Sequence, residues 1–217
     1  MTTFPGSPRL LKGALVGMDP SRPTREIILF QYNPETLTRR LEPRATTEER
    51  ADKTESYRLT GPPKETITVT IELDAADQLE QGDEEAVNSG IYPALSALET
   101  LVYPKSETTK ENVSLAQAGN IEIIPPEAPM TLFVWGDQRV LPVRITSFSI
   151  TERAYDQKLN PIRAEVELSL EVLSTADFRA SHPGHDIFLT HQTGKEKMAR
   201  KKIVSSSQQL GTSLKSF

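Results

Sequence analysis

The sequence contains no cysteine among its 217 residues. This absence excludes disulfides, thiolate metal sites and a cysteine nucleophile, and it fits a reducing compartment. Aromatic residues make up only 6% of the chain, so it can bury a core of moderate size but not a large one. No apolar run approaches the roughly 20 residues that span a bilayer, and the N-terminal residues lack a basic region followed by an apolar stretch. We therefore expect no membrane insertion and a cytoplasmic protein, unless it travels inside a larger particle.

Catalytic motifs are missing as well. Gly6, Gly13 and Gly17 are not followed by the Gly-Lys-Ser/Thr of a phosphate-binding loop. The Gly-x-Ser-x-Gly turn that presents a nucleophilic serine does not occur either. The net charge is −5 and the isoelectric point is about 5.4, which argues against general nucleic-acid binding. We expect neither an enzyme nor a nucleic-acid-binding protein, and we predict no cofactor.

Two clusters of candidate metal ligands have simpler explanations. His182, His185 and His191 fall within ten residues and could surround a metal, but a His-Pro-Gly-His sequence predicts a surface turn. The acidic stretch 74–88 lacks the Asp-x-Asp-x-Asp-Gly pattern of a calcium loop, and we interpret it as a solvated linker. The sequence therefore predicts no metal site.

The chain has, instead, a clear alternation of apolar and polar residues. Between residues 162 and 172, apolar side chains alternate with Arg, Glu and Ser, so one face of this strand is apolar and the other is charged. Such a strand belongs to an antiparallel sheet with one face on a core and the other in water. Residues 130–173 hold three such strands and predict a meander. Further strands are predicted at 10–16, 25–32 and 66–73.

The remaining segments predict one helix, long loops and two extensions. The leucine spacing in 91–103 is helical. Residues 42–57 and 105–124 are polar and predict long loops. The division that follows is a lead-in at 1–9, a β domain at 10–175 and a C-terminal extension or tail at 176–217, with a short helix considered around 195–204.

Two features of the sequence have alternative interpretations. The basic run in the extension is a solvated tail by default, but it could also contact an acidic partner; its members are Lys195, Lys197, Arg200, Lys201 and Lys202. Trp135 is the only tryptophan and precedes Gly136 at the end of an apolar strand. It either fills the core beside a hairpin turn or stacks on a glycan.

Three segments, taken together, resemble a known family. The sequence Phe30-Gln-Tyr32-Asn33-Pro34 is similar to its N-terminal signature, in which a strand ends in a Phe-x-Phe/Tyr-Asn-Pro turn. Residues 67–73, followed by Asp74, resemble its next strand. Residues 129–136, which include Trp135 and Gly136, together with 145–150 and 160–168, resemble its C-terminal meander. The family is the tube-type protein of contractile injection systems, which are phage-tail-like particles, and it includes the baseplate adaptor that joins the tail tube to the spike hub.

The resemblance covers roughly residues 10–175. It implies a tail-tube-like antiparallel β-barrel or sandwich with one flanking helix and long polar loops. It also implies a non-enzymatic subunit that forms a hexameric ring around a channel and contacts the inner tube protein and the spike, hub and baseplate proteins. The long loops favour the adaptor over a tube subunit. Some adaptors carry a lysin-motif domain, but residues 176–217 are too few and lack its Gly-Asp-Thr-Leu start. The alternative function is a free β-sandwich module that recognises a glycan or cell-wall polymer.

Overall fold

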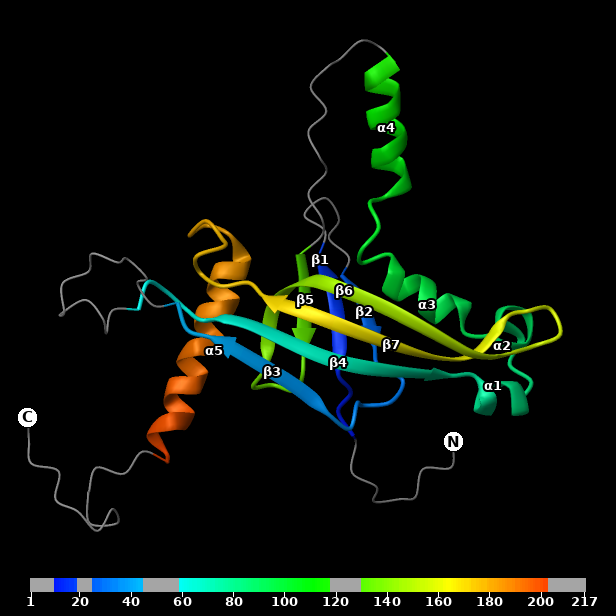
Figure 1. Ribbon diagram of the computed structural model, residues 1–217, viewed down its shortest axis with the longest axis horizontal. Helices are drawn as coiled ribbons and strands as arrows, with labels where there is room; N and C mark the ends of the chain where they lie inside the picture. The colour runs from blue at the N-terminus through cyan, green and yellow to red at the C-terminus, as the bar shows by residue number, and fades with distance from the viewer. Residues whose placement is uncertain (1–9, 19–24, 45–58, 118–129, 203–217) are drawn as a thin grey trace, which may run out of the picture.

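The computed structural model describes residues 10–18, 25–44, 59–117 and 130–202, and the fold is mainly β, as predicted. Seven strands form one antiparallel sheet in the order β2-β1-β5-β6-β7-β4-β3 (Figure 1). The strands are β1 (Ala14–Met18), β2 (Glu26–Leu29), β3 (Leu37–Glu42), β4 (Lys64–Asp74), β5 (Met130–Val134), β6 (Val140–Tyr155) and β7 (Pro161–Val172).

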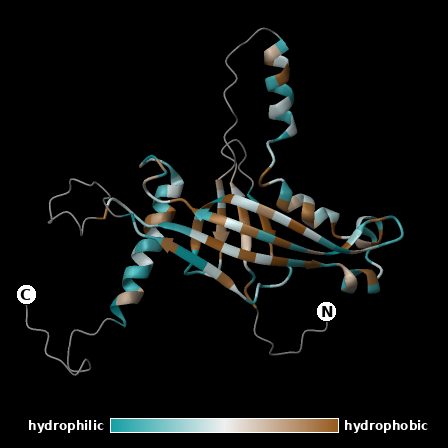
Figure 2. Cartoon of the chain, viewed as in Figure 1, coloured by the Kyte–Doolittle hydropathy of each residue, from teal (hydrophilic) through white to brown (hydrophobic). Residues whose placement is uncertain are grey.

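The predicted meander is present as β5, β6 and β7. The turn between β5 and β6 includes Gly136, whose φ of 69° lies in the left-handed region that favours glycine. Strand β7 has the alternation read from the sequence, because Ala164, Val166 and Leu168 are each fully buried while the residues between them are not. Figure 2 shows this alternation of hydrophobic and hydrophilic residues along the long strands.

Strand β4 lies between β7 and β3, although it precedes β7 by roughly ninety residues in the chain. Its register with β7 places Ile67 opposite Leu170 and Ile71 opposite Val166, and all four side chains are almost completely buried. These pairs form the centre of the core. The sequence predicted strand β4 and strand β7 separately, whereas their pairing is a property of the fold.

The structure contains more helix than the single flanking helix that was predicted. The helices are α1 (Ala76–Glu80), α2 (Glu84–Ser89), α3 (Tyr92–Glu99), α4 (Ser106–Gln117) and α5 (Pro183–Arg200). The predicted helix at 91–103 corresponds to α3, and its Leu95 and Leu98 side chains are buried in the core. None of the described helices is long and apolar enough to cross a membrane.

Helix α2 forms in a stretch that was interpreted as an acidic linker. The Asp83 carboxylate accepts a hydrogen bond from the Ala86 amide at 3.0 Å and so caps the helix. Glu84 and Glu85 lie in its first turn, where negative charge favours a helix N-terminus. The acidic residues therefore contribute to local folding as well as to the surface.

The prediction of a long loop at 105–124 is wrong for residues 106–117, which form α4. This helix has no buried residue and projects away from the sheet (Figure 1). An apolar stripe is the sequence signal for a packed helix, and α4 lacks one, in agreement with its having no buried residue.

Helix α5 begins earlier than the short helix considered around 195–204. His182 caps it by accepting a hydrogen bond from the Gly184 amide at 3.0 Å, and Pro183 occupies its first turn. The Phe188 and His191 side chains are buried on one face of the helix, and the helix lies against β6. The described part of the C-terminal extension is thus packed on the β domain.

The segment after β2 fastens two distant parts of the sheet. The Gln31 amide donates to the Asp74 carbonyl at 2.6 Å and accepts from the Asp74 amide at 2.9 Å, at the end of β4. The Asn33 amide donates to the Leu11 carbonyl at 2.7 Å and accepts from the Gly13 amide at 2.9 Å, just before β1. Because five strand intervals separate β2 from β4 in the sheet order, these contacts require a strongly curved sheet. We call Gln31 and Asn33 the amide clasp.

We predict that Asn33→Ala destabilises the protein by about 1–3 kcal/mol, because it leaves the Gly13 amide and the Leu11 carbonyl without their partner. Urea unfolding followed by circular dichroism measures the change. Gln192→Ala, which truncates an exposed amide on α5, is the matched control and should change stability by less than about 0.5 kcal/mol. Equal stability of the two variants would contradict this account of the clasp.

Candidate functional site

The most extensive functional candidate is one face of the four strands β6, β7, β4 and β3. Over residues 144–153 of β6 and 163–171 of β7, together with β4 and β3, the registers place only polar and charged side chains on the face opposite the core. We call it the polar face. Its residues are Thr38, Arg40, Glu42, Lys64, Thr66, Thr68, Thr70, Glu72, Asp74, Arg144, Ser147, Ser149, Thr151, Arg153, Arg163, Glu165, Glu167, Ser169 and Glu171.

Ion pairs cross the strands of the polar face. The Arg144 guanidinium lies 2.7 Å from a Glu171 carboxylate oxygen, and that of Arg153 lies 2.9 Å from Glu165. The hydrogen bond and charge of Arg144 lower the pKa of Glu171, and Glu171 in turn raises the pKa of Arg144. The charges of this pair are therefore retained over a wide pH range. Arg144 and Arg153 are more than half exposed, so these pairs contribute little to the free energy of unfolding. Their main effect is to hold charged side chains in place on the surface of the sheet.

One carboxylate of the polar face is unfavourably placed. Glu72 lies directly opposite Glu165 in the register of β4 and β7, and like charges at opposed positions are destabilising. Glu165 is paired with Arg153, whereas Glu72 has no ion pair among the described residues. Glu72 is thus an anionic group available to an incoming cation.

The signature residues named from the sequence lie in different surroundings. Phe30 is 1% exposed in the core, whereas Tyr32 is 46% exposed beside the polar face. Asp74 accepts hydrogen bonds from Arg163 and from the Ala76 amide, both at 2.8 Å. Asn33 and Pro34 form the turn that follows Tyr32. The amide clasp links this turn to Asp74 through Gln31, a residue within the quoted motif that the sequence did not single out.

Trp135 packs on the aromatic part of the core. Its ring stacks on Phe133 with centroids 6.0 Å apart and an interplanar angle of 14°, and it is tilted against Phe30 at 6.4 Å. A side chain at Gly13 would come within 2.7 Å of the Trp135 ring, so this packing requires glycine there. Both aromatic neighbours of Trp135 are buried, and they form no exposed platform with it.

A buried ion-pair cluster anchors α5 to the sheet. The Glu65 carboxylate has an exposed fraction of 5% and accepts a hydrogen bond from Arg39 Nε at 2.6 Å. Lys195 Nζ, from α5, lies 3.5 Å from the other Glu65 oxygen. Glu65 occupies a core-facing position of β4, where every second residue from 67 to 73 is apolar. That break in the alternation was a signal for this cluster, but the sequence did not identify the partners.

The residues of the basic run fall into two groups. Lys195 reaches the buried Glu65, while the other four basic residues, Lys197, Arg200, Lys201 and Lys202, are exposed at the end of α5. These four positive charges lie at the C-terminal end of the helix, where they complement the helix dipole. They leave that end of the molecule cationic.

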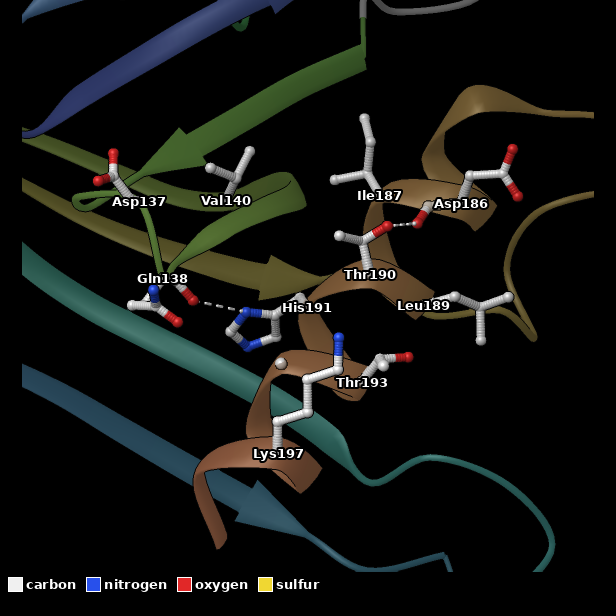
Figure 3. Close-up of a pocket in the computed structure, with 11 residues that line it drawn as sticks. Asp137, Gln138, Val140, Asp186, Ile187, Leu189, Thr190, His191, Thr193 and Lys197 are labelled. Atoms are coloured by element: carbon white, nitrogen blue, oxygen red, sulfur yellow. Dashed lines mark hydrogen bonds between the residues drawn. The ribbon is translucent and has the colours of Figure 1, made fainter. Parts of the chain in front are cut away.

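His191 is 9% exposed where α5 meets the turn between β5 and β6. Its Nδ1 lies 3.1 Å from the Gln138 carbonyl (Figure 3), and its buried Nε2 has no hydrogen-bond partner. A hollow of about 850 Å³ adjoins it, lined by Val140, Ile187, Thr190 and Lys197 among others. Within the described part of the chain, no three His, Cys, Asp or Glu residues are grouped as metal ligands. The three histidines have different surroundings: His182 caps α5, His185 lies beside Asp186, and His191 lies beside the Gln138 carbonyl.

Comparisons with known proteins are sparse. No family model and no curated protein matches this sequence. A solved structure described as "Virion of native gene transfer agent (GTA) particle" is similar to it with a TM-score of 0.28 and 12% identity. The match covers 74% of this chain and 90% of that one. At this TM-score the similarity establishes neither a shared fold nor a shared function.

We predict that Glu65→Gln lowers the free energy of unfolding by about 3 kcal/mol, because it leaves Arg39 and Lys195 beside a buried neutral group. Urea unfolding is the measurement, since urea does not screen ion pairs. Glu42→Gln is the matched control, because Glu42 pairs with Arg40 at the surface and its loss should cost less than about 1 kcal/mol. Similar losses in both variants would contradict a structural role of the buried cluster.

We also predict that stability falls as the pH drops below about 6.5. Burial lowers the pKa of His191 from its ordinary value of 6.5, and the charges of Lys195 and Arg39 lower it further, whereas the Gln138 carbonyl and Glu65 act in the opposite sense. The unfolded chain therefore takes up a proton at a pH where the folded protein does not. The contribution is fully present above 6.5 and is lost at up to about 1.4 kcal/mol per pH unit as the pH falls towards the folded pKa.

Urea unfolding of the wild type and of His191→Gln between pH 7.5 and 5 checks this prediction. The variant lacks the titrating ring, so its stability should depend less on pH than that of the wild type. Identical pH profiles would show that His191 does not contribute to the acid sensitivity.

Proposed function

We propose that this protein is a non-enzymatic structural subunit of a contractile injection system. In this proposal, copies form a hexameric ring whose polar face lines a central channel. The ring is an adaptor that joins the inner tube to the baseplate and the spike hub. It assembles in the cytoplasm into the injection particle and is carried with it.

The observation that carries the proposal is the polar face itself. A channel that other proteins pass through needs a lining without exposed apolar patches, because such patches bind passing chains. Over residues 144–153 of β6 and 163–171 of β7, together with β4 and β3, the polar face has no apolar side chain, and ion pairs between neighbouring strands hold several of its long side chains. The resemblance of the signature turn and the meander to tube-type proteins supports the same interpretation.

The two ends of the sheet support a position between two different proteins. Helix α5, with its four exposed cations, lies at one end, and α1 and α2 lie at the other (Figure 1). Residues 74–104, which contain α1, α2 and α3, include acidic residues but no Lys, Arg or His. If the strands run across the thickness of a ring, one rim carries this acidic stretch and the other carries the four cations of α5, which favours different partners at the two rims.

The features of helix α4 support a role in contacts with another subunit. It has twelve residues, no buried side chain and two exposed large apolar residues, Val113 and Leu115. Isolated helices of this length are marginally stable in water. Contact with another subunit would bury the apolar residues and stabilise the helix.

Native mass spectrometry and electron microscopy of the purified full chain test the proposal. We expect a six-membered ring with a central channel. In particle preparations, deletion of the gene should produce particles without a joined tube and baseplate, and restoring the gene should recover them. A chain that stays monomeric at high concentration and is absent from purified particles would overturn the proposal, and so would intact, loaded particles made without it.

A further inference from the structure

We propose that the hollow beside α5 is a docking groove for a helix of another protein. The groove lies between α5 and the turn that joins β5 to β6, and we call it the α5 groove. The incoming helix lies antiparallel to α5, with acidic residues in its first turn and basic residues in its last. The groove is separate from the polar face, so the inference goes beyond the proposed function and rests on it only for the source of the helix, which is another protein of the particle.

The α5 groove has the shape that a short helix needs. Asp186, Thr190, Thr193 and Lys197 line it from α5 and follow one another at spacings of four, three and four, so they lie on one face of that helix. At 1.5 Å per residue this face is about 16 Å long, or about three helical turns. Figure 3 shows α5 on one side of the hollow and the turn with Val140 on the other. The volume of about 850 Å³ falls within the range of binding pockets, ~300–1,000 Å³.

Gly194, which also lines the groove, is not required by the packing of the described residues. A side chain at this position would meet nothing within 4 Å. The other glycine of α5, Gly184, has an internal reason, because a side chain there would come within 2.6 Å of the Phe178 ring. Glycine disfavours a helix interior, but it allows another backbone to approach closely. We therefore assign to Gly194 the closest approach of the incoming helix.

Apolar side chains form the walls of the groove. Val140 and Ile187 are half-buried, and Leu189 has an exposed fraction of 41%. Apolar residues of a partner would bury these side chains further, which favours association. A helix reaches such walls with apolar anchors spaced three or four residues apart, as in other helix-in-groove contacts.

The charges at the two ends of the groove select the direction of the incoming helix. Asp137 and Asp186 lie at one end, and Lys197 lies at the other, with Arg200 and Lys201 one turn further along α5. A helix is most stable with acidic residues in its first turn and basic residues in its last. Antiparallel docking brings such a first turn to Lys197 and the last turn to the two aspartates, so every end charge meets its opposite.

Two segments of this chain fit the groove less well. Residues 203–217 include Lys215 but no Asp or Glu, so they offer no carboxylate side chain to Lys197. Helix α4 of a second copy has no basic residue in its last turn. Its exposed Val113 and Leu115 are two positions apart and point to different sides of the helix. Charge and spacing therefore favour a different protein as the occupant.

Titration of the full chain with two model peptides tests the groove and its direction. The first peptide has about 15 residues, glutamates in its first turn, leucines spaced four and three apart, and lysines in its last turn. The second has the glutamates and lysines exchanged, and one hydrocarbon staple on the face without leucines holds both helical. We expect saturable changes in the NMR amide signals of residues 137–140 and 186–197 with the first peptide, and at least about fivefold weaker binding of the second. No saturable change, changes elsewhere or equal affinities would overturn the inference.

Gly194→Leu tests the groove in the particle, with Gln192→Leu as the matched control, because Gln192 is an exposed residue of α5 that does not line the groove. Leucine is the better helix former, so Gly194→Leu should raise the midpoint of urea unfolding. Its side chain fills the groove, so the amount of the variant in purified particles should fall by about tenfold or more. The control should enter particles like the wild type.

The outcomes separate this inference from the proposed function. Wild-type incorporation of Gly194→Leu, or equal exclusion of both variants, overturns the inference and leaves the proposed function intact. A wild-type chain that is absent from particles overturns the proposed function and the source of the helix, while the peptide titration still decides whether the groove binds a helix.

Photo-cross-linking in purified particles identifies the occupant. The chain has no cysteine, so Thr193→Cys carries a photoreactive diazirine at a single position, and Glu196→Cys, outside the groove, is the control. A cross-link from position 193, but not from 196, to a helix of another particle protein with carboxylates in its first turn supports the inference. Cross-links to a second copy of this chain or to residues 203–217 overturn it.

Discussion

The rest of the structure depends on the antiparallel pairing of β4 with β7. Ten consecutive residue pairs place the apolar side chains of both strands on one face and the polar ones on the other. One-residue slippage would exchange these faces, which would bury charges and expose the core. This register decides which face of the two strands meets the core and which is the polar face. It therefore places Glu65 on the core side and Glu72 on the polar side.

Polar contacts then hold distant segments in place around that pair. The amide clasp attaches the end of β2 to the end of β4, and the Glu65 cluster attaches α5 to β3 and β4. Both involve part-buried or buried groups, where loss of a partner costs more than a surface contact contributes. The signature turn therefore contributes to folding through the hydrogen bonds of Gln31 and Asn33.

Local sequence patterns predicted the strands, helix and turn whose formation depends on residues close together in the chain. The alternation at 66–73 and 162–172 predicted β4 and β7, the leucine spacing predicted α3, and the glycine before Asp137 predicted the turn after β5. The prediction failed for α4, which carries no apolar stripe and has no buried residue. It was incomplete for α5, since only three of its residues, Gly184, Phe188 and His191, are buried.

The sequence by itself determined the mainly β class, the two faces of each long strand and the lack of cysteine chemistry, because these follow from side-chain type and a period of two. Only the tertiary structure decided which strands are neighbours, where the sheet is left unpaired and which charges face one another. Those properties depend on residues far apart in the chain. Arg163 and Asp74 form an ion pair although they are 89 positions apart, and no local pattern relates them. They face each other only because β7 pairs with β4.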